Sequence, residues 1–191
     1  MKNVQLYDKS FKPYMSYEEI QKAIDTVAEK INNDLKDEHT PIFLGVLTGS
    51  FMFFGDLLKR INLECETCFI RLASYEGTSS TGQVKQMLGL TQSVKDRNVV
   101  VVEDIVDTGG TITELYNILK ENGAKSIRIA TLMYKPGSYK GTVKIDYPAC
   151  SIPNDFIVGF GLDYDQIGRN LKDIYVLDPE ETEKRKAINV R

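Results

Sequence analysis

The chain has 191 residues, of which 42% are hydrophobic and 27% charged, and its formal net charge is −3. This length and composition suit a soluble globular domain with a substantial core. The slightly acidic balance argues against a nucleic-acid surface, which needs a basic face, and no apolar run approaches the ~20 residues of a membrane span. The polar N-terminus shows no signal peptide, so we expect a cytoplasmic protein with neither nucleic-acid nor membrane partners.

The first predicted helix begins after Ser16, which forms a capping-box pattern with Glu19. Apolar residues then follow at helical spacing, which predicts an amphipathic helix lying on a sheet. These residues are Ile20, Ile24, Val27, Ile31 and Leu35.

A buried strand is predicted over 42–47, and it runs through Thr48, Gly49 and Ser50 into an apolar helix over 51–58. The next strand, 63–72, contains the C-x-x-C pair Cys65 and Cys68. A redox pair needs a helix N-terminus, and a zinc site needs two further ligands, for which only Cys150 and His39 remain. We therefore expect structural thiols. An odd number of cysteines also suits a reducing compartment.

Small hydroxyl residues and glycines across 73–86 predict a mobile loop. A loop of this length in a compact domain is usually a lid or disordered, although composition alone leaves a passive hairpin excursion equally open. The segment 87–91 is predicted to return as a strand.

The stretch from Val99 to Thr111 organises the rest of the chain. Its run of four valines predicts a central parallel strand buried on both faces, with Glu103 and Asp104 at its end. A short turn then leads into a helix over 111–120. A strand, a glycine turn and a helix N-terminus together form a phosphate-binding site, because backbone N–H groups and the helix dipole favour an anion.

The helix after this turn carries its own boundary signals. Thr111 and Glu114 fit a second capping box, and Gly123 is a natural stop. Further strands are predicted over 126–133 and, as an edge strand, over 174–177.

The remaining segments complete the predicted fold. The stretch 152–165 combines a short strand with a glycine-rich acidic segment, and 179–186 forms a solvated helical turn. Alternating strands and helices predict an α/β fold, with a mostly parallel sheet and a site at the carboxyl ends of its strands.

Two carboxylates beside an anion-binding turn need an explanation. Glu103 and Asp104 repel the anions that the turn attracts. The acids and the turn can both bind one ligand if it carries a phosphate, a hydroxylated sugar and a metal ion such as Mg²⁺. Mg²⁺ is commonly shared between carboxylates and substrate phosphates. The plain alternative is a pair of solvated acids at a strand end.

Val99 to Thr111 resembles the signature for 5-phosphoribosyl 1-diphosphate (PRPP) of type I phosphoribosyltransferases. From about residue 5 to 178 the chain resembles the hypoxanthine-guanine members. The resemblance implies a Rossmann-like twisted sheet in a single domain over 1–191, with a flexible catalytic loop at about 73–86. It also implies a small hood, to which about 150–178 contributes, and a homodimer or homotetramer.

The resemblance also implies site residues, with Mg²⁺ as cofactor. In the donor half, the 5′-phosphate is assigned to Asp107, Thr108, Gly109, Gly110 and Thr111, and pyrophosphate is assigned to Thr48, Gly49 and Arg169. Ribose and metal-bound water are assigned to Glu103 and Asp104, and the metal to Asp163, Glu103 and Asp104. The purine is assigned to Lys135, Phe156, Ile157 and Asp163, and Ser74 and Tyr75 belong to the flexible loop.

Asp107 is the candidate general base. A carboxylate is a weak base for a neutral purine, but once N9 begins to bond to C1 the purine becomes cationic and its N7 proton is far more acidic. Lys135 can donate to a 6-oxo group and would clash with a 6-amino group. Phe156 would stack on the purine, and its plain alternative is a core aromatic.

The implied function is purine salvage. The enzyme would transfer the phosphoribosyl group from PRPP to N9 of hypoxanthine and guanine, giving IMP or GMP and pyrophosphate. The alternatives are a xanthine-preferring transferase and a PRPP-sensing, nucleic-acid-binding regulator of the same fold. Thr48 and Asp155 stand where relatives commonly carry lysine, which leaves pyrophosphate affinity and the ranking of the three 6-oxopurines open.

Overall fold

A computed structural model describes residues 1–73, 86–88, 90 and 92–189. Its central sheet has the strand order β5-β4-β3-β6-β7-β8 in the described part of the chain. Strands β4, β3, β6, β7 and β8 run parallel, and β5 is antiparallel to β4. This confirms the predicted, mostly parallel sheet. The strands are β3 (Ile42–Val46), β4 (Glu66–Ala73), β5 (Gln86–Leu88), β6 (Asn98–Val106), β7 (Ser126–Tyr134) and β8 (Tyr147–Ser151).

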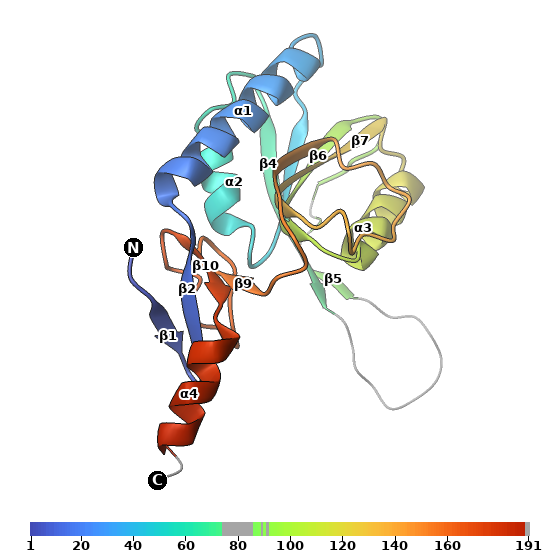
Figure 1. Ribbon diagram of the computed structural model, residues 1–191. Helices are drawn as coiled ribbons and strands as arrows, with labels where there is room; N and C mark the ends of the chain where they lie inside the picture. The colour runs from blue at the N-terminus through green and yellow to red at the C-terminus, as the bar shows by residue number, and fades with distance from the viewer. Residues whose placement is uncertain (74–85, 89, 91, 190–191) are drawn as a thin grey trace, which may run out of the picture.

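Helices cover both faces of this sheet (Figure 1). Helices α1 (Tyr17–Leu35) and α2 (Phe51–Leu58) pack on one face, and α3 (Gly110–Glu121) packs on the other. Side chains alternate along β6, so Val100 and Val102 join the core under α1 and α2, whereas Val99 and Val101 join the core under α3. The unbroken valine run is therefore explained by burial on both faces.

A second, antiparallel sheet is built from both ends of the chain, in the order β1-β2-β10-β9. Its strands are β1 (Val4–Leu6), β2 (Lys9–Met15), β9 (Ile157–Val158) and β10 (Ile174–Leu177), and helix α4 (Pro179–Asn189) contacts β2. The edge position predicted for 174–177 is wrong, because β10 lies between β2 and β9. We call this sheet, together with the segment 155–173 that contains β9 and leads to β10, the hood.

The two predicted capping boxes have different outcomes. At α1, the Glu19 N–H donates to Ser16 Oγ at 3.3 Å, and the Ser16 N–H donates to the Glu19 carboxylate at 2.8 Å, which confirms the box. At α3 the predicted box is wrong. The N-cap residue there is Gly109, in the left-handed region with φ of 88°, and no side chain caps the helix. The helix begins one residue early, which leaves its first N–H groups available for a ligand.

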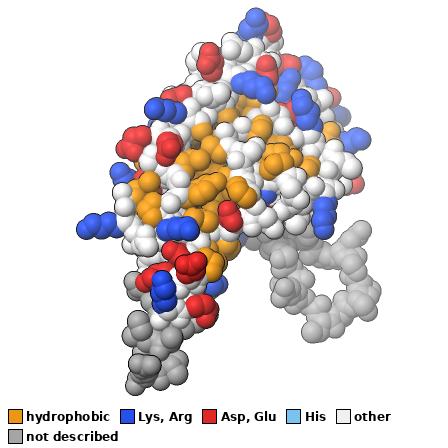
Figure 2. Space-filling model, in the orientation of Figure 1, with side chains coloured by type: hydrophobic (Ala, Val, Ile, Leu, Met, Phe, Trp, Pro, Cys, Tyr) orange, Lys and Arg blue, Asp and Glu red, His pale blue; other side chains and the backbone are white. Residues whose placement is uncertain are grey.

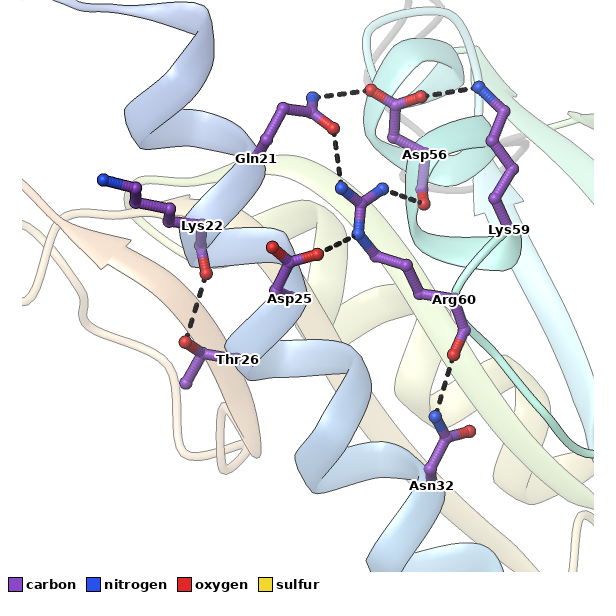
Figure 3. Close-up of polar contacts among 8 residues, drawn as sticks. All are labelled: Gln21, Lys22, Asp25, Thr26, Asn32, Asp56, Lys59 and Arg60. Atoms are coloured by element: carbon purple, nitrogen blue, oxygen red, sulfur yellow. Dashed lines mark hydrogen bonds and ion pairs between the residues drawn. The ribbon is translucent and has the colours of Figure 1, made fainter.

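A polar network ties the end of α2 to α1 (Figure 3). The Arg60 guanidinium donates to the Asp25 carboxylate, to Gln21 Oε1 at 2.8 Å and to the Asp56 carbonyl at 2.8 Å. The Asn32 side chain in turn donates to the Arg60 carbonyl at 2.8 Å. The helix that begins at the Thr48 loop is thus held at its far end by hydrogen bonds, as well as by apolar packing.

All three cysteines are unpaired and partly or fully buried. Cys65, Cys68 and Cys150 are free thiols, and burial raises the pKa of each. Within the described ranges, no group of three cysteine, histidine or carboxylate residues could hold a metal ion by itself. None of the helices that the structure describes is both long and apolar enough to cross a membrane.

Candidate active site

A cavity of 390 Å³ opens at the carboxyl edge of β3 and β6. It brings together seven of the predicted site residues, which come from four separate segments of the chain. These residues are Thr48, Gly49, Glu103, Asp104, Thr111, Asp163 and Arg169. The prediction that the site lies at the carboxyl ends of the parallel strands agrees with this position.

Glu103 and Asp104 both line the cavity, although they are consecutive residues of β6. Their carboxylates accept backbone hydrogen bonds at the strand's end, from the Asp104 N–H to Glu103 at 3.1 Å and from the Ile105 N–H to Asp104 at 2.7 Å. Burial, reinforced by the Asp104 charge, raises the pKa of Glu103 well above its usual range. Burial also raises the pKa of Asp104, against the opposing effects of a hydrogen bond with Glu103 and the Arg169 charge.

The loop after β3 approaches Asp104 very closely. The peptide bond between Leu47 and Thr48 is cis. A Cβ atom at Gly49 would overlap the Asp104 carboxylate, and one at Gly161 would overlap the Gly49 carbonyl. Glycine is required at these positions because two backbone segments and a carboxylate meet there.

Arg169 and Asp163 form an ion pair on the hood side of the cavity, with Nη2 and Oδ1 2.7 Å apart. The same guanidinium donates to the Gly161 carbonyl at 2.8 Å. The arginine is therefore held in place, and its planar group suits the oxygens of a phosphate.

The turn between β6 and α3 has the geometry of an anion site. Gly109 adopts a left-handed conformation, and the first N–H groups of α3 follow it without a side-chain cap. Thr108, Gly109 and Gly110 line a second cavity of 660 Å³ along α3. The next residue, Thr111, lines the first cavity instead. The predicted phosphate residues, 107–111, thus lie around the N-terminus of α3. We call these five residues the phosphate loop.

Lys135 and Asp107 form an ion pair that the sequence did not predict. Lys135 Nζ donates to Asp107 Oδ2 at 2.8 Å, between residues 28 positions apart. The lysine side chain is 8% exposed and that of Asp107 is 42% exposed. The Lys135 N–H also donates to the Val106 carbonyl at 3.0 Å. The candidate base and the candidate purine lysine are therefore direct neighbours.

The other predicted purine residues lie in the hood. Phe156 is 43% exposed, and it packs beside Phe11 and Tyr164 at centroid distances of 6.1 and 5.9 Å, with Lys9 Nζ over its ring, 5.7 Å from the centroid. The Ile157 side chain is buried in the main core, so a ligand contact there would come from its backbone. Asp155 is exposed.

One pair of predicted residues lies outside the described part of the chain, and two contacts near the site were not predicted. Ser74 and Tyr75 of the predicted catalytic loop lie outside the described residues. In the opposite direction, Tyr139 packs against Gly109, and Lys9 Nζ lies 3.9 Å from the centroid of the Tyr164 ring. No local pattern marks either contact, since each joins distant parts of the chain.

The donor set of the first cavity fits Mg²⁺ held jointly with a substrate. Three carboxylates line its wall, from Glu103, Asp104 and Asp163. The described residues do not converge into a metal site made by protein alone. Mg²⁺ commonly takes one or two carboxylates and completes its shell with water and substrate phosphate oxygens. Carboxylates spread over a cavity beside an anion-binding turn suit that arrangement.

Comparison with known proteins identifies the family. The model of the phosphoribosyl transferase domain matches residues 15–165. A hypoxanthine-guanine phosphoribosyltransferase of Lactococcus lactis is 41% identical over 88% of this chain and 92% of its own length. One of Bacillus subtilis is 38% identical over 88% and 93%.

Solved structures agree with these relatives. A Trypanosoma cruzi hypoxanthine phosphoribosyltransferase structure superimposes with a TM-score of 0.82 at 35% identity, over 96% of this chain and 100% of that chain. A Bacillus anthracis hypoxanthine-guanine enzyme gives a TM-score of 0.77 at 30% identity, over 87% and 96%. The phosphoribosyl signature, the cavity at the carboxyl edge of the sheet and these relatives lead to one conclusion. The chain belongs to the type I phosphoribosyltransferase family, alongside the hypoxanthine-guanine enzymes.

Proposed function

We propose that this protein transfers the 5-phosphoribosyl group of PRPP to N9 of hypoxanthine or guanine, giving IMP or GMP and pyrophosphate. The main supporting observation is the Lys135–Asp107 pair, in which a half-exposed carboxylate directly after β6 meets a buried ammonium directly after the neighbouring strand β7. The names and close similarity of the relatives support the same reaction.

The donor half of the site follows from the phosphate loop and the acids. Backbone N–H groups of the loop, with the Thr108 and Thr111 hydroxyls, would bind the 5′-phosphate. Glu103 and Asp104 would face the ribose, where negative charge stabilises the positive charge that develops as the bond from C1 to pyrophosphate breaks.

The leaving group would be held by Arg169 and by the backbone of Thr48 and Gly49. The Arg169–Asp163 ion pair would keep the guanidinium aimed at this position. Mg²⁺, held by Asp163 and by Glu103 or Asp104, would neutralise the departing pyrophosphate. Because Thr48 carries no charge, Arg169 is the cationic side chain among the described residues that line this cavity.

The acceptor half would use the ion pair directly. Lys135 can donate to the 6-oxo group of a purine, and Asp107 can accept the N7 proton once N9 begins to bond to C1. A 6-amino group presents donors to the same lysine, so adenine is disfavoured. Phe156 is partly exposed, and the purine would stack on its ring.

The two alternatives are less well supported. A nucleic-acid-binding regulator needs a basic face, whereas the net charge is −3 and the face in Figure 2 intersperses acidic and basic side chains around a central hydrophobic area. A xanthine-preferring enzyme is not favoured by the names of the relatives.

We further infer one catalytic domain that assembles into a homodimer or homotetramer in the cytoplasm. The hood uses both ends of the chain and contributes to the cavity through Asp163 and Arg169, which supports a single domain. Leu47, Phe51 and Phe69 are exposed apolar side chains near the pyrophosphate residues, and a second copy could cover them. Free thiols suit a reducing compartment.

The direct test is product identification. The purified protein is incubated with PRPP and one of hypoxanthine, guanine, xanthine or adenine, with and without Mg²⁺, and nucleotides and pyrophosphate are quantified. We expect IMP and GMP, dependent on Mg²⁺. Failure to form a nucleotide from any of the four bases would overturn the proposal.

A further inference from the structure

The segment 135–143 folds back onto the phosphate loop. The Ser138 and Tyr139 N–H groups both donate to the Lys135 carbonyl at 3.1 Å, and the Lys140 N–H donates to the Thr108 carbonyl at 3.1 Å. The chain therefore leaves the lysine of the acceptor half, turns tightly and returns to the loop of the donor half.

The Tyr139 ring lies at the centre of this fold. A Cβ atom at Gly109 or at Gly141 would overlap the ring, so two glycine backbones pack closely against it. Its hydroxyl donates to the Val143 carbonyl, and its ring lies edge-on to Tyr134 with centroids 5.6 Å apart. The backbone of Gly109, Gly141 and Val143 and the ring of Tyr134 thus restrict the position of the Tyr139 side chain.

Gly109 is the glycine of the phosphate loop that adopts a left-handed conformation. It adopts φ of 88°, and a glycine can visit many other conformations at little cost. The orientation of the N–H groups that follow depends on this conformation. A rigid ring against the Gly109 backbone excludes alternatives before any ligand binds, which is preorganisation of anion donors.

We propose that Tyr139 is a positioning residue that holds the phosphate loop in its phosphate-binding conformation. The proposal rests on the proposed function, because it assigns the 5′-phosphate to this loop. Lys135 has separate anchors in the Val106 carbonyl and Asp107. The effect of Tyr139 should therefore fall on PRPP binding rather than on purine binding.

The test compares Tyr139→Ala and Tyr139→Phe with a control, Tyr116→Ala. Tyr116 is a half-buried tyrosine on α3 that packs against the same core cluster as Tyr139. For Tyr139→Ala we expect the KM for PRPP and the Kd for ribose 5-phosphate to rise about tenfold or more, with the KM for hypoxanthine unchanged. Tyr139→Phe keeps the ring and should bind PRPP like the wild type. The control should lose stability and keep its KM for PRPP.

Several outcomes would overturn the inference. An unchanged KM for PRPP in Tyr139→Ala is one, and an equal rise in Tyr116→Ala is another, because it would indicate general loosening of α3. A Phe variant as impaired as the Ala variant would show that the ring is not responsible. If the Ala variant does not fold, Tyr139→Leu replaces it, because leucine fills the space without a planar ring. We expect the same rise in the KM for PRPP and in the Kd for ribose 5-phosphate.

Failure of the proposed function is recognised separately. A wild-type protein that binds ribose 5-phosphate but forms no nucleotide would contradict the transferase reaction, and calorimetry of ribose 5-phosphate binding to the same variants would still decide the role of Tyr139. A wild type that does not bind ribose 5-phosphate would overturn both.

Discussion

At the scale of single residues, the site is defined by two charges that neutralise each other before substrate arrives. Lys135 is nearly buried and Asp107 is half-exposed, with Nζ and Oδ2 2.8 Å apart. A buried ammonium without a partner would be costly, and the carboxylate supplies that partner. A 6-oxopurine offers an oxygen to the lysine and a proton to the carboxylate, so it can replace this ion pair contact by contact.

The first prediction concerns the base. Asp107→Asn keeps the size of the side chain and removes its ability to accept a proton. We expect kcat to fall about 100-fold or more, the lower end of what a general base contributes, while the KM for PRPP stays close to the wild-type value. Steady-state kinetics with hypoxanthine measure both parameters. An Asn variant with full turnover would exclude Asp107 as the base.

A second prediction uses the raised pKa of Glu103, which results from burial and from the neighbouring Asp104 charge. A carboxyl group with a raised pKa binds its proton more tightly in the folded state. Its stabilising contribution is complete below the unfolded pKa, about 4.3, and is lost as pH rises through the folded pKa. Against Glu103→Gln, the unfolding free energy of the ligand-free wild type should therefore decrease as pH rises.

Urea denaturation of both proteins at a series of pH values, without added metal, measures this difference. The gap between their unfolding free energies should change as pH rises above about 4.3 and become constant again above the folded pKa of Glu103. A constant gap across the series would show that Glu103 titrates normally.

At the scale of elements, α2 matters because the loop at its start forms one wall of the cavity. Its end is bound to α1 through two of the acceptors of Arg60, which are Asp25 and Gln21. Arg60→Ala should lower the unfolding free energy by about 1–3 kcal/mol, since hydrogen bonds to charged groups are lost and their partners are left without a donor. The neighbouring Lys59, whose side chain is 73% exposed, is the matched control.

Chemical denaturation of both variants measures this effect. Lys59→Ala should change the unfolding free energy by less than about 1 kcal/mol, because exposed ion pairs contribute little. Equal losses in the two variants would mean that the Arg60 contacts shown in Figure 3 have no special role.

Local sequence patterns predicted the elements whose causes are local. The spacing of apolar residues in α1, its Ser16 cap and the valine run of β6 all report burial directly. Strand β2 was missed because Lys12 and Pro13 interrupt its pattern, and β8 because Pro148 lies within a short edge strand.

Other features depend on contacts that no local pattern records. Strand β10 was placed at an edge because its partner β2 lies at the opposite end of the chain. The capping box at α3 failed because the left-handed Gly109 had already become the N-cap. The Lys135–Asp107 pair and the contact of Tyr139 with Gly109 join residues that the sheet topology brings together, so their neighbourhood follows only from the fold.

At the scale of the whole molecule, the two sheets together build both the donor and the acceptor halves of the proposed site. The main sheet presents the phosphate loop, the acids and Lys135 at its carboxyl edge, and the hood supplies Phe156, Asp163 and Arg169. Gly161 of the hood packs on Gly49 of the main sheet's loop, so the two parts meet at the cavity itself. Reaction therefore requires that both sheets be in place.

The central claim is that Lys135, paired with Asp107, selects a 6-oxopurine for phosphoribosyl transfer. The most direct measurement is the ratio of kcat/KM for hypoxanthine to kcat/KM for adenine, in the wild type and in Lys135→Met. The account predicts a ratio of about 100 or more in the wild type, because a misplaced donor leaves buried polar groups unpaired, and a collapse of that ratio in the variant. A wild-type ratio near one, or a variant that keeps the wild-type ratio, would contradict it.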